Sequence, residues 1–179
     1  PPQDIEAEQA VLGAIFLDSD TLIDAMEIVT PRSFYRRSHQ IIFQSMIQLS
    51  NRGEAIDLVT LKAEIEKSNA LEDIGGISYL SELSQSTPSS ASVSYYAKIV
   101  DDKSLLRQLI QTANQIVVKS FEQGEEVQAI VDEAERSILE VSEKRNSTGF
   151  QSIADVLNQS IETIKKLQVY LLVIRHSIK

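Results

Sequence analysis

The chain has 179 residues, of which 42% are hydrophobic, which is enough for one domain with a hydrophobic core and an appendage. Its formal net charge of −9 argues against direct, strong binding to nucleic acid, and the absence of cysteine excludes disulfides and thiolate metal sites. Because the longest strongly apolar run covers only residues 169–174, whereas a membrane-spanning helix needs roughly 20 residues, we expect no membrane segment.

Apolar residues at helical spacing run through the first part of the chain, and patterns typical of strands are nearly absent. The spacing predicts a first helix that begins after the capping residue Asp4 and carries acidic residues in its first turn. A second helix is predicted over residues 19–29, with Ser19 or Asp20 as its cap and Pro31 as the residue that ends it.

Three further helices are predicted at residues 35–53, 57–68 and 77–84. Gly53 is a C-terminal stop for the first of them, Asp57 caps the second, and two adjacent glycines precede the third. The Ser-, Thr- and Pro-containing residues 85–92 then break the pattern. We therefore predict an all-α fold that opens with a compact helical bundle over residues 1–91.

Residues 92–145 are predicted to form a long antiparallel helical hairpin, with its turn near Gly124. The second helix carries apolar residues close to a seven-residue repeat, which is typical of helices that pack against one another. Since a two-helix hairpin cannot bury both of its apolar stripes alone, we expect it to pack on the bundle or on another copy of the chain. The residues predicted to mediate self-association are Val127, Ile130, Val131, Ala134, Ile138 and Val141.

The last part of the chain is set apart from the hairpin. Residues 146–149 are interpreted as a flexible connector, residues 150–167 as a separate amphipathic helix, and residues 168–179 as a tail of unknown origin. The apolar stripe of this helix needs another surface to cover it, so we expect the helix to dock on a partner. Its predicted docking residues are Phe150, Ile153, Leu157, Ile161, Ile164 and Leu167.

No motif for catalysis or metal binding stands out. The sequence contains no Walker A loop, no G-x-S-x-G elbow and no H-E-x-x-H pair, so we expect this chain by itself to have no catalytic residues, no metal and no cofactor. His39, near the start of a predicted helix, is interpreted as a hydrogen-bonded structural residue. The arginines at positions 32, 36 and 37 are interpreted as a solvated face rather than a DNA site.

Six blocks of sequence lie in order along residues 1–145. They are PPQDIEAEQAVLGAIFLD at 1–18, FYRRSHQIIFQSM at 34–46, DLVTL at 57–61, IGGISYLSEL at 74–83, YYAKIVDDKSLLRQLI at 95–110 and DEAERSILEVSE at 132–143. Together they resemble the N-terminal domain of the bacterial DnaB-type replicative DNA helicases. The resemblance implies a globular bundle with a protruding hairpin. It also implies that hairpins pair into dimers, and that the dimers form a collar on a hexameric ring in the bacterial cytoplasm.

The same resemblance implies partners for each part of the chain. The parent would be an ATP-dependent DNA-unwinding motor at the replication fork, and its motor domain, which is not in this sequence, would bind ATP and Mg²⁺. The helix at 150–167 would be the linker helix that packs on the motor domain of a neighbouring subunit. The collar domain would bind the C-terminal domain of a DnaG-type primase, and a helicase loader is a further candidate partner.

The implied primase-binding residues are Glu6, Tyr79, Ile110 and Ile116. Two alternatives stay open at this point: Glu6 can instead be a charge favoured by the helix dipole, and the isoleucines, six positions apart on one helix, can be core residues. The alternative function, from another class, is a stand-alone helical adaptor or loader-like regulator of the replisome without a motor domain.

Overall fold

The structure is a computed structural model that describes residues 1–87, 89–122, 124 and 126–147, with side chains up to residue 143. All of the regular secondary structure among these residues is helical, with no strand, which confirms the predicted all-α fold. The elements are α1 (Ile5–Leu17), α2 (Thr21–Met26), the short 3₁₀ helix η1 (Pro31–Ser33), α3 (Arg37–Asn51), α4 (Leu58–Glu66), α5 (Gly76–Ser84), α6 (Val93–Glu122) and α7 (Val127–Ser147).

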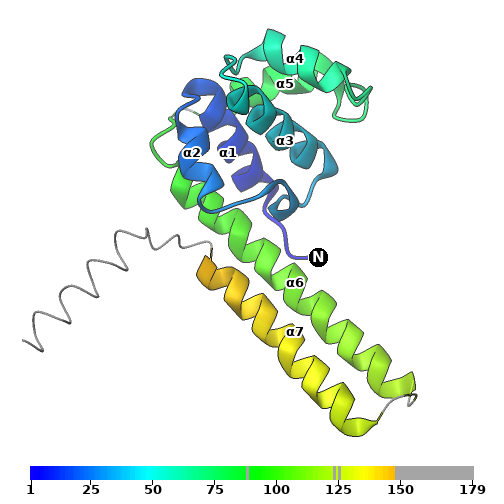
Figure 1. Ribbon diagram of the computed structural model, residues 1–179. Helices are drawn as coiled ribbons and strands as arrows, with labels where there is room; N and C mark the ends of the chain where they lie inside the picture. Colours follow the sequence, from blue (N-terminus) through cyan, green and yellow to red (C-terminus); the bar gives the residue numbers. More distant parts are fainter. Residues whose placement is uncertain (88, 123, 125, 148–179) are drawn as a thin grey trace, which may run out of the picture. The chain divides into compact units, whose positions relative to one another are not determined.

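Helix α1 lies at the centre of the bundle and packs against α3, α5 and α6 (Figure 1). It begins as predicted, because the Asp4 carboxylate accepts a hydrogen bond of 2.9 Å from the Ala7 backbone N–H. Apolar side chains on more than one face of the helix are buried, including Val11, Leu12 and Ile15. A helix that is apolar over most of its surface is typical of a central position in a core.

The second helix is shorter than predicted. It ends at Met26, so the expectation that it runs to residue 29 and is stopped by Pro31 is wrong. Pro31 instead opens η1, where its missing N–H and fixed φ suit a first helical position. Asp20 stands at the N-cap position, as one of the two predicted caps, but its side chain makes no capping hydrogen bond. The Thr21 hydroxyl donates instead to the Asp18 carbonyl at 2.7 Å.

The ends of the next three helices agree with the sequence. Gly53, after α3, has a φ of 68°, and Gly75, before α5, has a φ of 99°; both values favour glycine. The Asp57 carboxylate accepts hydrogen bonds from the Val59 and Thr60 N–H groups at the start of α4. These contacts lower the pKa of Asp57, because they favour the charged carboxylate.

Helix α6 belongs to both the bundle and the hairpin. Its first half buries Val93, Ala97 and Val100 in the bundle core, and its second half lies beside the antiparallel α7 (Figure 1). The chain accordingly divides into a unit Pro1–Thr148, which holds bundle and hairpin together, and a unit Gly149–Lys179. Helix α7 continues to Ser147. The predicted linker helix at 150–167, its docking residues and the tail at 168–179 lie outside the described residues.

At Gly13, α1 closely approaches the end of α5 and the residues that follow it. A Cβ at this position would lie 2.9 Å from the Thr87 hydroxyl oxygen and 3.0 Å from the Leu83 carbonyl oxygen, and still closer to the Ser86 hydroxyl. The Ser86 and Thr87 hydroxyls use this space to donate hydrogen bonds to carbonyls of α1.

We expect Gly13→Ala to destabilise the fold by about 2 kcal/mol, since the added methyl forces the Ser86–Thr87 segment away from α1. Urea unfolding followed by circular dichroism measures this. Gly124→Ala is the matched control, because the nearest atom to its added Cβ is 4.0 Å away. Equal midpoints for the two variants would contradict the close approach.

Candidate interaction surface

A groove of about 1100 Å³ lies along α6 and α7 and is also lined by the N-terminal residues Pro1 and Pro2. Ile110 and Ile116 line it from α6, and Ile130 and Ala134 line it from α7. Apolar side chains from two facing helices, with polar groups between them, are typical of a surface that receives another protein element. The groove is therefore the first candidate interaction site.

Arg107 joins three segments at the groove. Its guanidinium donates hydrogen bonds to the carbonyl oxygens of Pro2 at 2.7 Å and Ser33 at 2.5 Å, and it lies 5.6 Å from the centre of the Tyr35 ring. Burial lowers the pKa of the Arg107 guanidinium. These contacts hold the N-terminal segment and η1 against α6. They thereby place Pro1 and Pro2 where they line one side of the groove.

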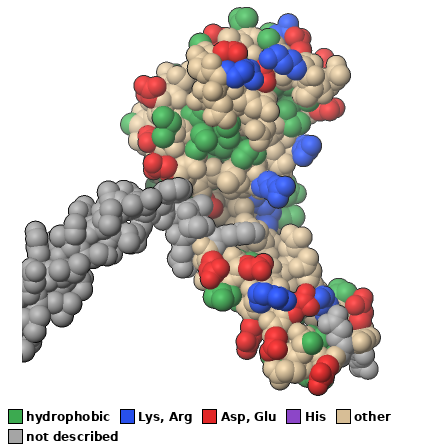
Figure 2. Space-filling view, viewed as in Figure 1, with side chains coloured by type: hydrophobic (Ala, Val, Ile, Leu, Met, Phe, Trp, Pro, Cys, Tyr) green, Lys and Arg blue, Asp and Glu red, His purple; other side chains and the backbone are tan. Residues whose placement is uncertain are grey.

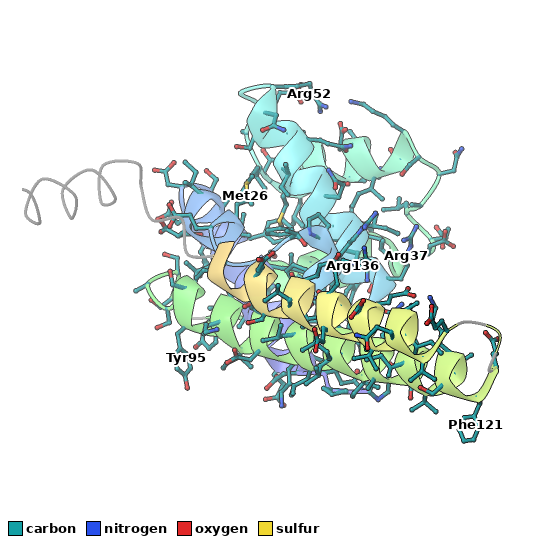
Figure 3. All side chains as sticks on the ribbon, turned by 60° about the horizontal axis from the view of Figure 1, so that its bottom comes forward. Met26, Arg37, Arg52, Tyr95, Phe121 and Arg136 are labelled. Carbon is teal, nitrogen blue, oxygen red and sulfur yellow. The ribbon has the colours of Figure 1, made fainter. Side chains whose placement is uncertain are left out.

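The hairpin leaves much of its apolar surface uncovered. Figure 2 shows acidic and hydrophobic side chains interspersed along its visible face, and Phe121 points away from the tip (Figure 3). Phe121 is 82% exposed and Val127 is 76% exposed. Of the predicted self-association residues, Val127, Val131 and Ile138 are exposed, and Ile130, Ala134 and Val141 are half-buried.

The two helices of the hairpin are held together partly by charge. The Lys119 ammonium of α6 forms an ion pair with the Glu133 carboxylate of α7, and this hydrogen bond lowers the pKa of Glu133.

Leu139 adds to the exposed apolar surface of α7. It is 57% exposed and was not among the predicted self-association residues, because it falls outside their seven-residue spacing. The hairpin thus presents a wider apolar surface than the predicted stripe.

A buried polar chain crosses the bundle from α1 through α3 to α5. The Nδ1 atom of His39 lies 2.6 Å from the Glu8 carboxylate, and its Nε2 atom lies 2.6 Å from the Tyr79 hydroxyl. Glu8 also accepts a hydrogen bond of 2.6 Å from the Tyr35 N–H. His39 is fully buried and Glu8 is 1% exposed. The interpretation of His39 as a hydrogen-bonded structural residue is therefore confirmed.

Tyr79 also lines a second hollow, of about 480 Å³, at the junction of α3 and α5. The charged residues that line this hollow are Arg36, Glu72, Asp73 and Glu82. Gln9 of α1 donates a hydrogen bond of 3.3 Å to the Tyr79 hydroxyl. Tyr79 is half-buried, so it joins the buried polar chain to the protein surface.

The structure places the four predicted primase-binding residues in different surroundings. Ile110 and Ile116 line the same groove, and since Ile110 is 48% exposed and Ile116 is half-buried, neither is a core residue. Tyr79 lines the second hollow, and Glu6 is exposed in the first turn of α1 without lining either cavity. Glu8, His39 and Arg107 support these surfaces and were not predicted as parts of a site.

Within the described residues, no group of three or more His, Asp or Glu side chains could hold a metal ion. None of the helices described is both long and apolar enough to cross a membrane.

The described residues thus form a helical bundle with a long hairpin whose exposed apolar side chains are of the kind that often mark protein–protein interaction sites. Residues 1–102 match the family described as DnaB-like helicase N terminal domain. The match covers more than half of the sequence, and the chain belongs to this family.

Similar proteins agree with this membership. The replicative DNA helicase DnaB of Geobacillus stearothermophilus is 50% identical over 167 residues, which make up 93% of this chain and 37% of that protein. The crystal structure of the N-terminal domain of DnaB helicase from Mycobacterium tuberculosis is 39% identical, with a TM-score of 0.75 over 78% of this chain and 99% of that one.

A second similar structure is that of a DnaB-like replicative helicase, reported with its interactions with primase. It is 24% identical, with a TM-score of 0.64 over 89% of this chain and 35% of that one, and it shows the same fold. The chain described here thus spans little more than a third of the length of the helicases it resembles.

Proposed function

We propose that this chain is the oligomerisation and primase-docking part of a hexameric replicative DNA helicase and is not catalytic by itself. Family membership supports the proposal, together with the uncovered apolar surface of the hairpin. The parent protein would be an ATP-dependent DNA-unwinding motor at the replication fork, with ATP and Mg²⁺ as cofactors of its motor domain. No observation favours the alternative of a stand-alone adaptor or loader-like regulator.

The proposed partners rest on membership of the family and on the exposed surfaces of the bundle and hairpin. A second copy of the chain covers the hairpin, and the hexamer is built from such dimers. The C-terminal domain of a DnaG-type primase binds the groove and the face around Tyr79. The segment at 150–167 docks on the motor domain of a neighbouring subunit, a helicase loader is a further partner, and the assembly works in the bacterial cytoplasm.

Light scattering tests the proposal directly. We expect the chain alone to have the mass of a dimer or hexamer, and to gain the mass of the primase C-terminal domain when the two are mixed. A chain that stays monomeric and does not bind the primase domain at micromolar concentrations would contradict both the self-association and the primase docking.

Tyr79→Ala is expected to weaken binding of the primase domain by about 1–2 kcal/mol, because aromatic side chains at protein interfaces often contribute this much. Isothermal titration calorimetry measures the change, and the helix content of the variant should match that of the parent. Tyr95→Ala is the matched control, since Tyr95 is 69% exposed on α6 and points away from the helices (Figure 3). Equal affinities for the two variants would remove Tyr79 from the interface.

A further inference from the structure

The groove between α6 and α7 carries its unpaired charges at its two ends. The charged side chains that line it are Arg107, Lys119, Glu122 and Glu133. Arg107 lies at the end next to the bundle, and Glu122 is the last residue of α6, 15 positions further along. At 1.5 Å per residue, these two positions are roughly 22 Å apart along the helix axis. Ile110 and Ile116 lie between them.

Arg107 is a half-buried cation with hydrogen-bonding capacity to spare. Two of the five N–H groups of a guanidinium are used here, on the carbonyl oxygens of Pro2 and Ser33. Among the described side chains, no carboxylate forms an ion pair with Arg107. The charge of Glu8 acts on it from further away, but the Glu8 carboxylate already accepts a hydrogen bond from the Tyr35 N–H. Three N–H groups of Arg107 therefore remain for a ligand in the groove.

The tip end of the groove has the opposite charge. Lys119 and Glu133 form an ion pair, so their charges offset each other. Glu122 is exposed, and it makes no ion pair with any side chain that the structure describes. The groove thus offers a cation beside the bundle and a carboxylate near the tip. A ligand that complements it carries negative charge at the bundle end and positive charge at the tip end.

A single helix of a partner protein matches this arrangement. About 15 residues of helix span the distance between Arg107 and Glu122. One apolar face of such a helix covers the apolar lining from both helices, which includes Ile116 and Ile130. The C-terminal end of a helix carries partial negative charge, so it is favoured beside a cation. The charges of the groove therefore favour one direction of the bound helix over the other.

We propose that the groove binds an amphipathic helix of the primase C-terminal domain with its C-terminal end at the bundle, and that Arg107 binds a carboxylate of that helix. The inference rests on the proposed function and names the chemistry that the docking site recognises. Arg107 sets the direction of the helix, and Glu122 faces basic residues near its start. A helix with the same apolar stripe and the opposite order of charges binds more weakly.

The first test is a double-mutant cycle between this chain and the C-terminal domain of a DnaG-type primase. Each Asp and Glu of the primase domain is replaced in turn by Asn or Gln, and its affinity is measured for the parent chain and for Arg107→Gln. For one carboxylate we expect a loss of roughly tenfold with the parent and less than about twofold with Arg107→Gln. A weakened fold of Arg107→Gln lowers the affinity for every primase variant alike, so it cancels in the cycle.

The second test leaves Arg107 intact. Glu122→Lys should weaken primase binding about three- to tenfold, because it places a cation against the basic part of the helix. Glu126→Lys is the matched control, since Glu126 is also exposed beside the hairpin tip but does not line the groove. Its affinity should stay within about twofold of the parent. Thermal unfolding of the two variants should agree, because both replace exposed carboxylates.

A cycle in which no carboxylate couples to Arg107, or equal affinities of Glu122→Lys and Glu126→Lys, would overturn this inference while the parent still binds primase. Arg107→Gln that loses self-association in light scattering and keeps its primase affinity would assign the groove to a second copy of the chain, and would overturn it too. Absence of primase binding by the parent would instead overturn the proposed function and this inference with it.

Discussion

Ile138→Asp is expected to weaken self-association of the chain about 100-fold, which corresponds to about 3 kcal/mol. Ile138 is 42% exposed on α7, so a carboxylate at this position stays in contact with water in the single chain and costs the fold little. When a second copy covers the hairpin, the same carboxylate loses its water without gaining a partner. The penalty therefore falls on the assembled form.

The measurement is sedimentation equilibrium over a range of protein concentrations. Ala129→Asp is the matched control, because it adds the same charge at an exposed position of α7 outside the predicted self-association residues. We expect the control to associate like the parent while Ile138→Asp is monomeric at the same concentration. Equal association of all three proteins would show that the apolar surface of α7 is not the interface.

Much of the fold can be predicted from local sequence signals, such as residues that cap or end helices. The Asp4 and Asp57 caps and the stop at Gly53 each depend on contacts within a few residues, and the structure shows all three. The hairpin follows from two long amphipathic helices around Gly124. The end of α2 was missed because Pro31 suits two different positions, after a helix or at the start of the next one.

The support of the candidate surfaces could not be predicted in the same way. Glu8 and His39 are 31 positions apart, and His39 and Tyr79 are 40 apart, so only the packing of three helices brings them together. In the sequence Glu8 is indistinguishable from Glu6, since both are acidic residues in the first turn of one helix. What separates them is burial, which depends on the face that α1 turns toward α3.

This difference gives the second large expected effect: Glu8→Ala should destabilise the fold by about 3 kcal/mol or more. The substitution removes the acceptor of the His39 Nδ1 hydrogen and of the Tyr35 N–H, and the truncated side chain leaves no space that bulk water reaches, since Glu8 is 1% exposed. Thermal unfolding followed by circular dichroism measures the loss.

Glu6→Ala and Glu8→Gln together show whether the cause is the buried polar chain. Glu6 is exposed in the same turn, so its replacement should change stability by less than about 0.5 kcal/mol. Glutamine at position 8 can still accept from the Tyr35 N–H, and His39 can move its hydrogen to Nε2 to accept from the amide, so the loss should be about half that of alanine. If Glu8→Ala were as stable as Glu6→Ala, the buried contact would contribute nothing to the fold.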